Sequence, residues 1–489
     1  MAHRIIIVGA SGYIGSQLIP LLLEQGHQVI ACARNIQYLT DRVQQHPNLR
    51  CEYLDLENKT TIEPLLFDCD IGYFLVHGMS HGHDFIDYEV SLAQNFADAA
   101  EQSQLKRIIY LSALQPENHQ SQHLLARQKT GEILRSTGIT TIEIQSGIII
   151  GAGSAALEIM TDFINHLPII LCPKWIHSQA NPIAIDNLND YLIQCLDIEV
   201  SNSLSLEAGG PDTVTYLQLF NLLAKRLNKS IKIIPTRFIS PKFAGLWLGI
   251  ITSVPSELGR ALLAGIDHDL LADNSKIQQL MPQTLTPLPE ALKLANHTSA
   301  NSLQGEIWGF DPSALRRWQP DYGYYPKQAG ASFTTNASAS SLWKVILRLG
   351  GPEGYFFANG LWRTREWLDP LLGGSFPIRR KPKSDQLQLG DYIDSWKVIR
   401  CENNEFLSLL FGMTAPGLGR LEFSIKELEN NTRELDVRAW WHPKGFWGLM
   451  YWFAMFPAHL FIFKGMVKAI CKKAEKEEKE EKEEKEEKG

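Results

Sequence analysis

The 489-residue sequence has few of the features that mark exported, metal-binding or nucleic-acid-binding proteins. Its seven cysteines are scattered and form no Cys-x-x-Cys pair, which excludes a disulfide framework and a zinc site and indicates reduced thiols. The formal net charge is −7 and no basic stripe stands out, so we expect no nucleic-acid partner. An apolar strand begins at Arg4, which leaves no room for a signal peptide. These absences predict a cytoplasmic protein without a bound metal.

The length of the chain predicts more than one domain, because a single core rarely serves so many residues. A small, polar stretch around 329–338, rich in alanine, serine and threonine, is typical of a linker. We therefore expect a first domain over residues 1–320 with a substrate lobe at about 154–300, a linker over 321–341, a second domain over 342–471 and a Glu/Lys tail over 472–489.

The first domain alternates apolar strands with helical stretches, which predicts an α/β, doubly wound parallel sheet with right-handed crossovers. Helices are expected over 84–103 and 121–136, and the predicted strands cover residues 4–8, 28–33, 50–54, 71–76, 107–111 and 141–145. Ligands of such sheets bind beyond the carboxyl ends of the strands. The functional residues are therefore expected at those ends.

A glycine-rich turn follows the first strand and opens a helix. Its spacing is Gly-x-x-Gly-x-x-Gly, and its residues are Gly9, Ser11, Gly12, Tyr13, Ile14 and Gly15. Backbone N–H groups and the positive end of the helix dipole attract an anion at such a junction, and a dinucleotide pyrophosphate fits this place best. The alternative is a tight turn that binds no ligand.

Arg34 follows the second predicted strand directly. An arginine at this place matches a ribose 2′-phosphate by its charge and by its fork of donors, so it favours NADP over NAD as the cofactor. Arginines at strand ends are also often only solvated, and that alternative stays open.

The glycine spacing resembles the extended and atypical branches of the short-chain dehydrogenases, which include NmrA-like proteins. The resemblance implies that Asp55 and Leu56 contact the adenine ring, although Asp55 is also placed to cap the following turn. It further implies that Ser112 occupies the place of the catalytic serine. His77, at the end of the fourth strand, either places its backbone against the cofactor or supplies a proton.

The catalytic helix departs from the pattern of the family. Ordinary members carry a tyrosine four residues before a lysine, and the tyrosine exchanges a proton with the substrate oxygen. Lys129 takes the lysine place, but Leu125 stands where the tyrosine is expected, and leucine exchanges no proton. Lys129 then either holds the nicotinamide ribose or is a surface lysine. Tyr88 is a further possible proton source.

The second half has a different pattern. Antiparallel strands are expected over 387–389, 396–400, 406–413, 420–425 and 432–440, followed by an apolar helix over 446–470. This order resembles the helix-grip architecture of START and polyketide-cyclase-like domains, and the combination of both halves resembles a bacterial family. Residues 446–463 approach the length of a membrane span. Burial against the curved sheet is the favoured interpretation, and peripheral membrane contact is the alternative.

These observations predict an NADP-binding oxidoreductase that acts on an apolar or quinone-like compound. An apolar stretch at 243–251 belongs either to the core or to a lid over such a substrate. Because the tyrosine is missing, a non-catalytic redox sensor or a carrier of a hydrophobic, lipid-like ligand is the alternative. The sequence determines neither the substrate nor the oligomeric state.

Overall fold

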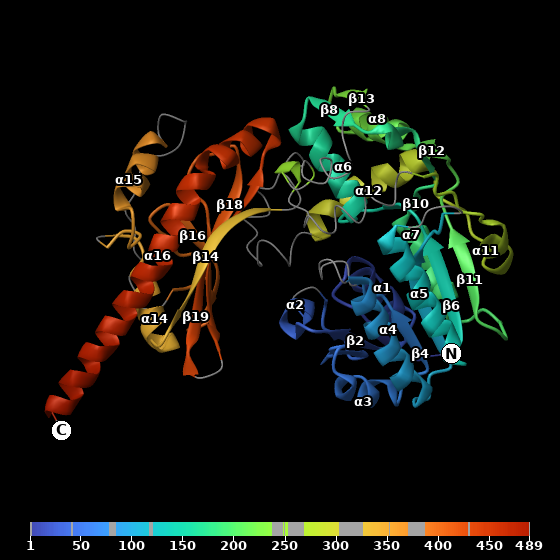
Figure 1. Ribbon diagram of the computed structural model, residues 1–489, viewed down its shortest axis with the longest axis horizontal. Coiled ribbons are helices and arrows are strands. Elements are labelled where there is room, and N and C mark those ends of the chain that lie inside the picture. Colours follow the sequence, from blue (N-terminus) through green and yellow to red (C-terminus); the bar gives the residue numbers. More distant parts are fainter. Residues whose placement is uncertain are drawn as a thin grey trace. The chain divides into compact units, whose positions relative to one another are not determined.

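The computed structural model describes residues 2–40, 43–77, 85–116, 121–236, 248, 250–252, 268–302, 326–351, 353–369, 387–428 and 431–488. The chain divides into two compact units, shown in Figure 1. The N-terminal unit comprises Met1–Ile164 and Pro168–Glu306, and the C-terminal unit comprises Asn165–Leu167 and Ile307–Gly489.

A seven-stranded parallel sheet forms the centre of the N-terminal unit. Its strand order is β11-β6-β5-β4-β1-β2-β3. All strands are parallel, and the side on which successive strands are added to the sheet changes between β1 and β4. The strands are β1 (Arg4–Val8), β2 (Gln28–Ala33), β3 (Leu49–Tyr53), β4 (Ile71–Phe74), β5 (Arg107–Ala113), β6 (Thr140–Ser146) and β11 (Leu204–Ala208). The predicted α/β class and its six strands are confirmed with small shifts at their ends. The seventh strand, β11, was not predicted.

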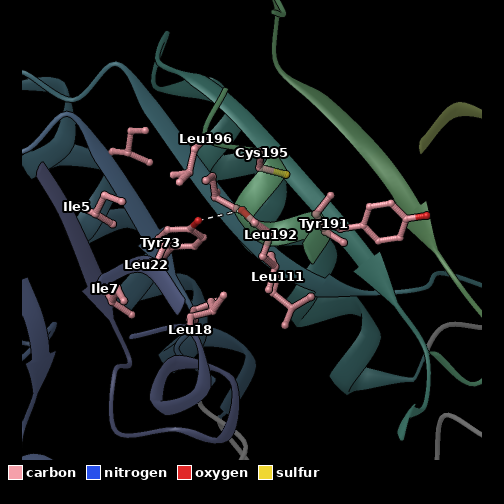
Figure 2. Packing of buried hydrophobic residues seen from close by; sticks show 14 of the residues in the cluster. Ile5, Ile7, Leu18, Leu22, Tyr73, Leu111, Tyr191, Leu192, Cys195 and Leu196 are labelled. Carbon is pink, nitrogen blue, oxygen red and sulfur yellow. Dashed lines mark hydrogen bonds between the residues drawn. The ribbon is translucent and has the colours of Figure 1, made fainter. Parts of the chain in front are cut away.

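Helices cover both faces of this sheet because the strands are apolar on both sides. They are α1 (Tyr13–Glu24), α2 (Ile36–Thr40), α3 (Glu63–Leu66), α4 (Phe85–Glu101), α5 (Gln122–Ser136) and α7 (Ile185–Gln194), with a 3-10 turn at Lys59–Thr61. On one face, α1 and α7 pack over Ile5 and Ile7 (Figure 2). There the Tyr73 hydroxyl donates to the Leu192 carbonyl at 2.9 Å. Helices α3, α4 and α5 pack on the other face.

Smaller elements after β6 form the lobe of the N-terminal unit. Short strand pairs join β7 (Ile149–Ile150) to β10 (Ile183–Ala184), β8 (Ile169–Cys172) to β13 (Lys232–Pro235) and β9 (Gln179–Ala180) to β12 (Val214–Thr215). The helices are α6 (Ala155–His166), α8 (Tyr216–Arg226), α11 (Ser275–Leu280) and α12 (Leu288–Ser302), with a 3-10 turn at Lys174–His177. Most of the predicted apolar stretch at 243–251 lies outside the described residues.

The C-terminal unit contains a six-stranded antiparallel sheet in the order β14-β19-β18-β17-β16-β15. Its elements are β14 (Lys327–Thr335), α14 (Ala339–Ile346), α15 (Asn359–Leu368), β15 (Tyr392–Ile393), β16 (Trp396–Glu402), β17 (Phe406–Leu410), β18 (Gly417–Glu427), β19 (Arg433–Pro443) and α16 (Gly445–Lys488). The predicted strand at 387–389 is wrong, because β15 begins at Tyr392.

The linker predicted over 321–341 is wrong for most of its length. Residues 327–335 form β14, which pairs along all nine residues with β19, and α14 begins at Ala339. Residues 321–325 lie outside the described part of the chain. The small and polar composition of this segment suggested a linker. The segment nevertheless forms a strand because its backbone pairs with β19, which lies about 100 residues later in the chain.

Helix α16 is longer than predicted and presents two different faces. Leu449, Trp452 and Phe463 are buried within the C-terminal unit. Its exposed apolar side chains are Phe446, Trp447, Met450, Phe453, Phe456, Leu460 and Phe461. By length and composition the helix could cross a membrane, and only 28% of the residues in its most apolar 18-residue window are buried within the protein. The favoured interpretation, burial of this segment, therefore holds for one face only.

The first turns of the predicted Glu/Lys tail are part of the C-terminal unit. The Glu475 carboxylate accepts from the Thr335 hydroxyl at 2.5 Å, and the Glu478 carboxylate accepts from the Ser338 N–H at 2.8 Å. Ala474 is fully buried. These contacts correct the prediction of a tail from residue 472 onward.

Candidate functional site

The glycine turn connects β1 to α1 at the point where the strand order reverses. Gly9 has a φ of +93°, and an added Cβ would lie 2.9 Å from the Leu75 carbonyl carbon, so only glycine fits there. The Gly12 N–H donates to the Gly9 carbonyl at 3.0 Å, which closes the turn. Helix α1 begins at Tyr13 with neither a side-chain cap nor an acidic residue in its first turn. Its N-terminal N–H groups therefore suit an incoming phosphate.

A cavity of about 450 Å³ extends from this turn across the carboxyl ends of β4, β5 and β6 into the lobe. Seven of the predicted site residues line it: Gly9, Gly12, Tyr13, Ile14, Gly15, His77 and Ser112. Ser11, Arg34, Asp55, Leu56 and Lys129 are not among the lining residues. The glycine turn and two of the predicted catalytic residues thus face one space.

The lobe end of the cavity is apolar. Its walls come from α6, from the loop after β8 and from α8, and they include Ile159, Met160, Phe163, Trp175 and Phe220. Such walls exclude water from this end of the cavity.

Arg34, Asp55 and Leu56 lie at the strand ends, as predicted, but their environments differ. Arg34 is exposed directly after β2. One Asp55 carboxylate oxygen accepts from the Glu57 N–H at 3.1 Å, which is the turn-capping alternative. Leu56 is buried, and its carbonyl accepts from the Asn95 side chain at 2.8 Å. Their predicted contacts with a cofactor stay predictions.

Tyr88 lies near these strand ends and is already engaged. Its hydroxyl donates to the Glu57 carboxylate at 2.6 Å. Burial and this hydrogen bond raise the pKa of Tyr88 to about 12. The hydroxyl therefore holds its proton firmly, and Tyr88 is outside the cavity lining. This placement does not support its use as a proton source.

The structure does not bring Lys129 to the cavity. Lys129 is exposed on α5, and Leu125 is half-buried; neither lines the cavity. The lining residues of this helix are His123, Leu124 and Arg127. Two residues correspond to a rotation of about 200° around a helix, so Arg127 and Lys129 point in nearly opposite directions. The catalytic role predicted for Lys129 loses its geometric basis.

His123 and Arg127 were missed by the sequence reasoning. Both are buried, and their spacing of four residues places them on one face of α5. The Arg127 guanidinium lies 3.3 Å from the Glu89 carboxylate of α4, and burial lowers the pKa of Arg127 to about 9. Burial also lowers the pKa of His123 to about 4. In the sequence, His123 and Arg127 have the same four-residue spacing as Leu125 and Lys129, and they lie two positions earlier.

Unpartnered polar atoms gather at the sheet end of the cavity. Nδ1 of His123 and Oγ of Ser146 are buried and have no hydrogen-bond partner within the described part of the protein. Ser112, on the neighbouring strand β5, is 7% exposed and lines the same space. Buried polar atoms are normally paired, so these two atoms lack, among the described residues, the partner that a ligand or an ordered water supplies in other proteins. Among the described residues, no group of three or more metal-ligating side chains occurs.

Glu158 of α6 carries a buried carboxyl group whose pKa burial raises to about 7, although it accepts from the Gly153 N–H at 3.0 Å. Between pH 4.5 and 7 the folded chain keeps a proton that the unfolded chain loses, so stability falls as the pH rises through this window. We expect Glu158→Gln to remove this fall and to raise the free energy of unfolding at pH 8 by about 2 kcal/mol. Urea denaturation at pH 5 and pH 8 measures both effects.

The matched control is Glu132→Gln, on the exposed face of α5. Its pH profile is expected to follow that of the unchanged protein. Parallel profiles for Glu158→Gln and the unchanged protein would show that Glu158 titrates as an ordinary glutamate.

Comparisons with known proteins agree with this architecture. Residues 9–140 match a family described as NAD(P)H-binding, and residues 328–466 match a family described as "Protein of unknown function (DUF2867)". The search of curated proteins gave no match. The predicted START-like likeness of the C-terminal unit is not confirmed by its family match.

Solved structures similar to this chain include three nucleotide-binding enzymes. The Citrobacter sp. triphenylmethane reductase complexed with NADP(H) is 18% identical, with 60% of this chain and 99% of that chain covered and a TM-score of 0.49. The Bordetella bronchiseptica enzyme WbmH in complex with NAD+ is 15% identical, with coverage of 62% and 99% and a TM-score of 0.49. The Thermotoga maritima UDP-glucose 4-epimerase is 14% identical, with coverage of 62% and 100% and a TM-score of 0.49.

The strand order and the glycine turn define the centre of the N-terminal unit as a Rossmann fold, and residues 9–140 match the NAD(P)H-binding family. The residues present fit such a cofactor. Gly12 is exposed at the cavity wall, where a larger side chain would fill the cradle, and the N-terminus of α1 is uncapped.

Proposed function

We propose that this protein is an NADP(H)-dependent oxidoreductase that acts on an apolar or quinone-like compound. The observation that carries the proposal is the single cavity that joins the glycine turn to the apolar walls of the lobe. A cofactor held at the turn and an uncharged substrate held at α6 would therefore meet in one space. The nicotinamide would supply or accept the hydride, and the apolar walls would exclude water from that transfer.

The glycine turn and the end of β2 would hold the cofactor. Backbone N–H groups at Tyr13 and Ile14 suit the pyrophosphate, and the exposed guanidinium of Arg34 suits a 2′-phosphate. The experiment that tests the proposal is titration with NADPH and NADH, followed by NADPH oxidation with a panel of carbonyl and quinone compounds. Failure of both cofactors to bind at millimolar concentration would refute it.

Arg34→Ala is expected to weaken NADPH binding by about 10-fold to 100-fold, because the 2′-phosphate loses a charged, bidentate partner. NADH binding should change less than threefold, since NADH lacks that phosphate. Fluorescence titration measures both affinities. Arg50→Ala, which removes an exposed arginine that pairs with Glu52 on β3, is the matched control. Equal losses for NADPH and NADH would contradict the role of Arg34 in cofactor selection.

The second candidate function is a redox sensor or hydrophobic-ligand carrier that binds NADP without turnover. Leu125 in place of tyrosine and the exposed Lys129 favour it, because the ordinary catalytic pair is missing. Sustained NADPH oxidation with any compound of the panel would decide against this candidate.

A cytoplasmic location and a small apolar ligand belong to the same proposal. The seven free cysteines support reduced surroundings, and the cavity walls support the ligand class. Membrane contact through 446–463 and the absence of a nucleic-acid partner remain predictions.

A further inference from the structure

The polar end of the cavity carries an inference that rests on the proposed function and deepens it. The missing tyrosine leaves the reaction without its usual proton-exchanging group. The cavity wall nevertheless contains a buried imidazole, His123, which is 9% exposed and has an unpartnered Nδ1. Ser112 and Ser146 line the same space from the ends of β5 and β6.

The surrounding contacts hold His123 in place. Helix α5 begins at Gln122, and Ser121 caps it by accepting from the Leu124 N–H at 3.3 Å. One turn further on, Arg127 pairs with Glu89 and so ties α5 to α4. A side chain in the first turn of a capped and anchored helix has a defined position, which proton exchange with a bound substrate requires.

The geometry points to His123 as the catalytic residue that exchanges the substrate proton. In the oxidation direction, the His123 imidazole accepts the hydroxyl proton: the O–H bond breaks and its electron pair forms the carbonyl bond. The C–H electron pair leaves as a hydride to the oxidised cofactor, which is the oxidant. Reduction reverses these events: the neutral imidazole first takes up a proton from water and then gives it to the substrate oxygen.

Burial keeps the His123 side chain in its neutral form. Because burial lowers the pKa of His123 to about 4, the imidazole is unprotonated at neutral pH and free to accept a hydrogen bond or a proton. Apolar side chains line most of the rest of the cavity, so the hydrogen-bond acceptor for a substrate hydroxyl lies at this end of the site.

The first test measures ligand binding and needs neither cofactor nor turnover. The probes are 2-naphthol, which carries one hydroxyl group, and naphthalene, which carries none. We expect the unchanged protein to bind 2-naphthol at least 10-fold more tightly than naphthalene in fluorescence titrations. In His123→Phe, which keeps an aromatic ring without a nitrogen, this preference should disappear. Equal preference in both proteins overturns the assignment.

The second test measures turnover with the compound found in the panel of carbonyls and quinones. His123→Phe should lower kcat by about 100-fold while NADPH binding stays within threefold, and His123→Ala should regain activity with added imidazole. Glu132→Ala, on the exposed face of α5, is the control and should keep full activity. Unchanged kcat in His123→Phe overturns the assignment.

The two proposals fail in different ways. Absence of NADPH binding in the unchanged protein refutes the proposed function, yet the naphthol comparison still decides whether His123 is a hydroxyl acceptor. Normal NADPH binding and turnover with no effect of His123→Phe refute the assignment of His123 alone.

Discussion

Gly12→Val is expected to weaken NADPH binding at least 100-fold and to leave the seven-stranded sheet folded. An added Cβ at Gly12 would meet only the Gly9 carbonyl oxygen, at 3.2 Å, and the backbone there is extended with a φ of −74°, which valine adopts readily. The valine methyl groups would, however, occupy the cavity wall at the start of α1, where the pyrophosphate must approach the backbone. The loss corresponds to about 2.7 kcal/mol of binding free energy.

Isothermal titration with NADPH measures the affinity, and far-ultraviolet circular dichroism measures the fold. Gly72→Ala is the matched control, because Gly72 lies within β4 outside the cavity lining and an added Cβ meets side chains at 3.4 Å or more. NADPH affinity within threefold of normal in Gly12→Val would show that the turn is only a connection between β1 and α1.

Gly330→Val is expected to destabilise the C-terminal unit by about 3 kcal/mol. Gly330 lies in the middle of β14, and an added Cβ would come within 2.6 Å of the Val437 carbonyl oxygen and 2.9 Å of the Arg438 Cα. Both atoms belong to the backbone of β19, which cannot turn aside as a side chain does. The substituted strand must therefore shift its pairing with β19.

Thermal unfolding of the full chain, followed by tryptophan fluorescence, measures this effect. Ser332→Val, at an exposed position two residues along the same strand, is the control and should leave the transition within about 0.5 kcal/mol. If both variants unfold at the same temperature as the unchanged protein, the pairing of residues 327–335 with β19 does not contribute to the stability of the C-terminal unit.

The sequence predicted the centre of the N-terminal unit because its signals there are local. The β-branched run of β1 and the glycines that follow it determine strand, turn and helix start within about 15 residues. Strand β11 was missed because Leu204–Ala208 is only five residues long, although its alternation of apolar and polar residues is typical of a strand. It becomes a strand by pairing with β6, and a single sequence does not show that pairing.

The part of the cavity formed by the glycine turn was predicted from the sequence, whereas the polar side chains of α5 that line it were missed. The glycine spacing predicts a phosphate-binding turn from backbone geometry alone. The role of Lys129, in contrast, was inferred only from the resemblance to a family. Which residues of α5 face the cavity depends on how that helix packs against α4, through the pair of Arg127 and Glu89. This rotation of the helix is a tertiary property, so the importance of His123 emerged only from the structure.

The pairing of β14 with β19 also determines the order in which the C-terminal unit can fold during synthesis. About 100 residues separate Thr335 from its partner Arg433, so β14 leaves the ribosome long before β19 exists. The turns of α16 that contact Thr335 and Ser338 emerge later still. The strands of the N-terminal sheet are therefore all synthesised first, and the C-terminal unit closes only after residues 433–478 have been made.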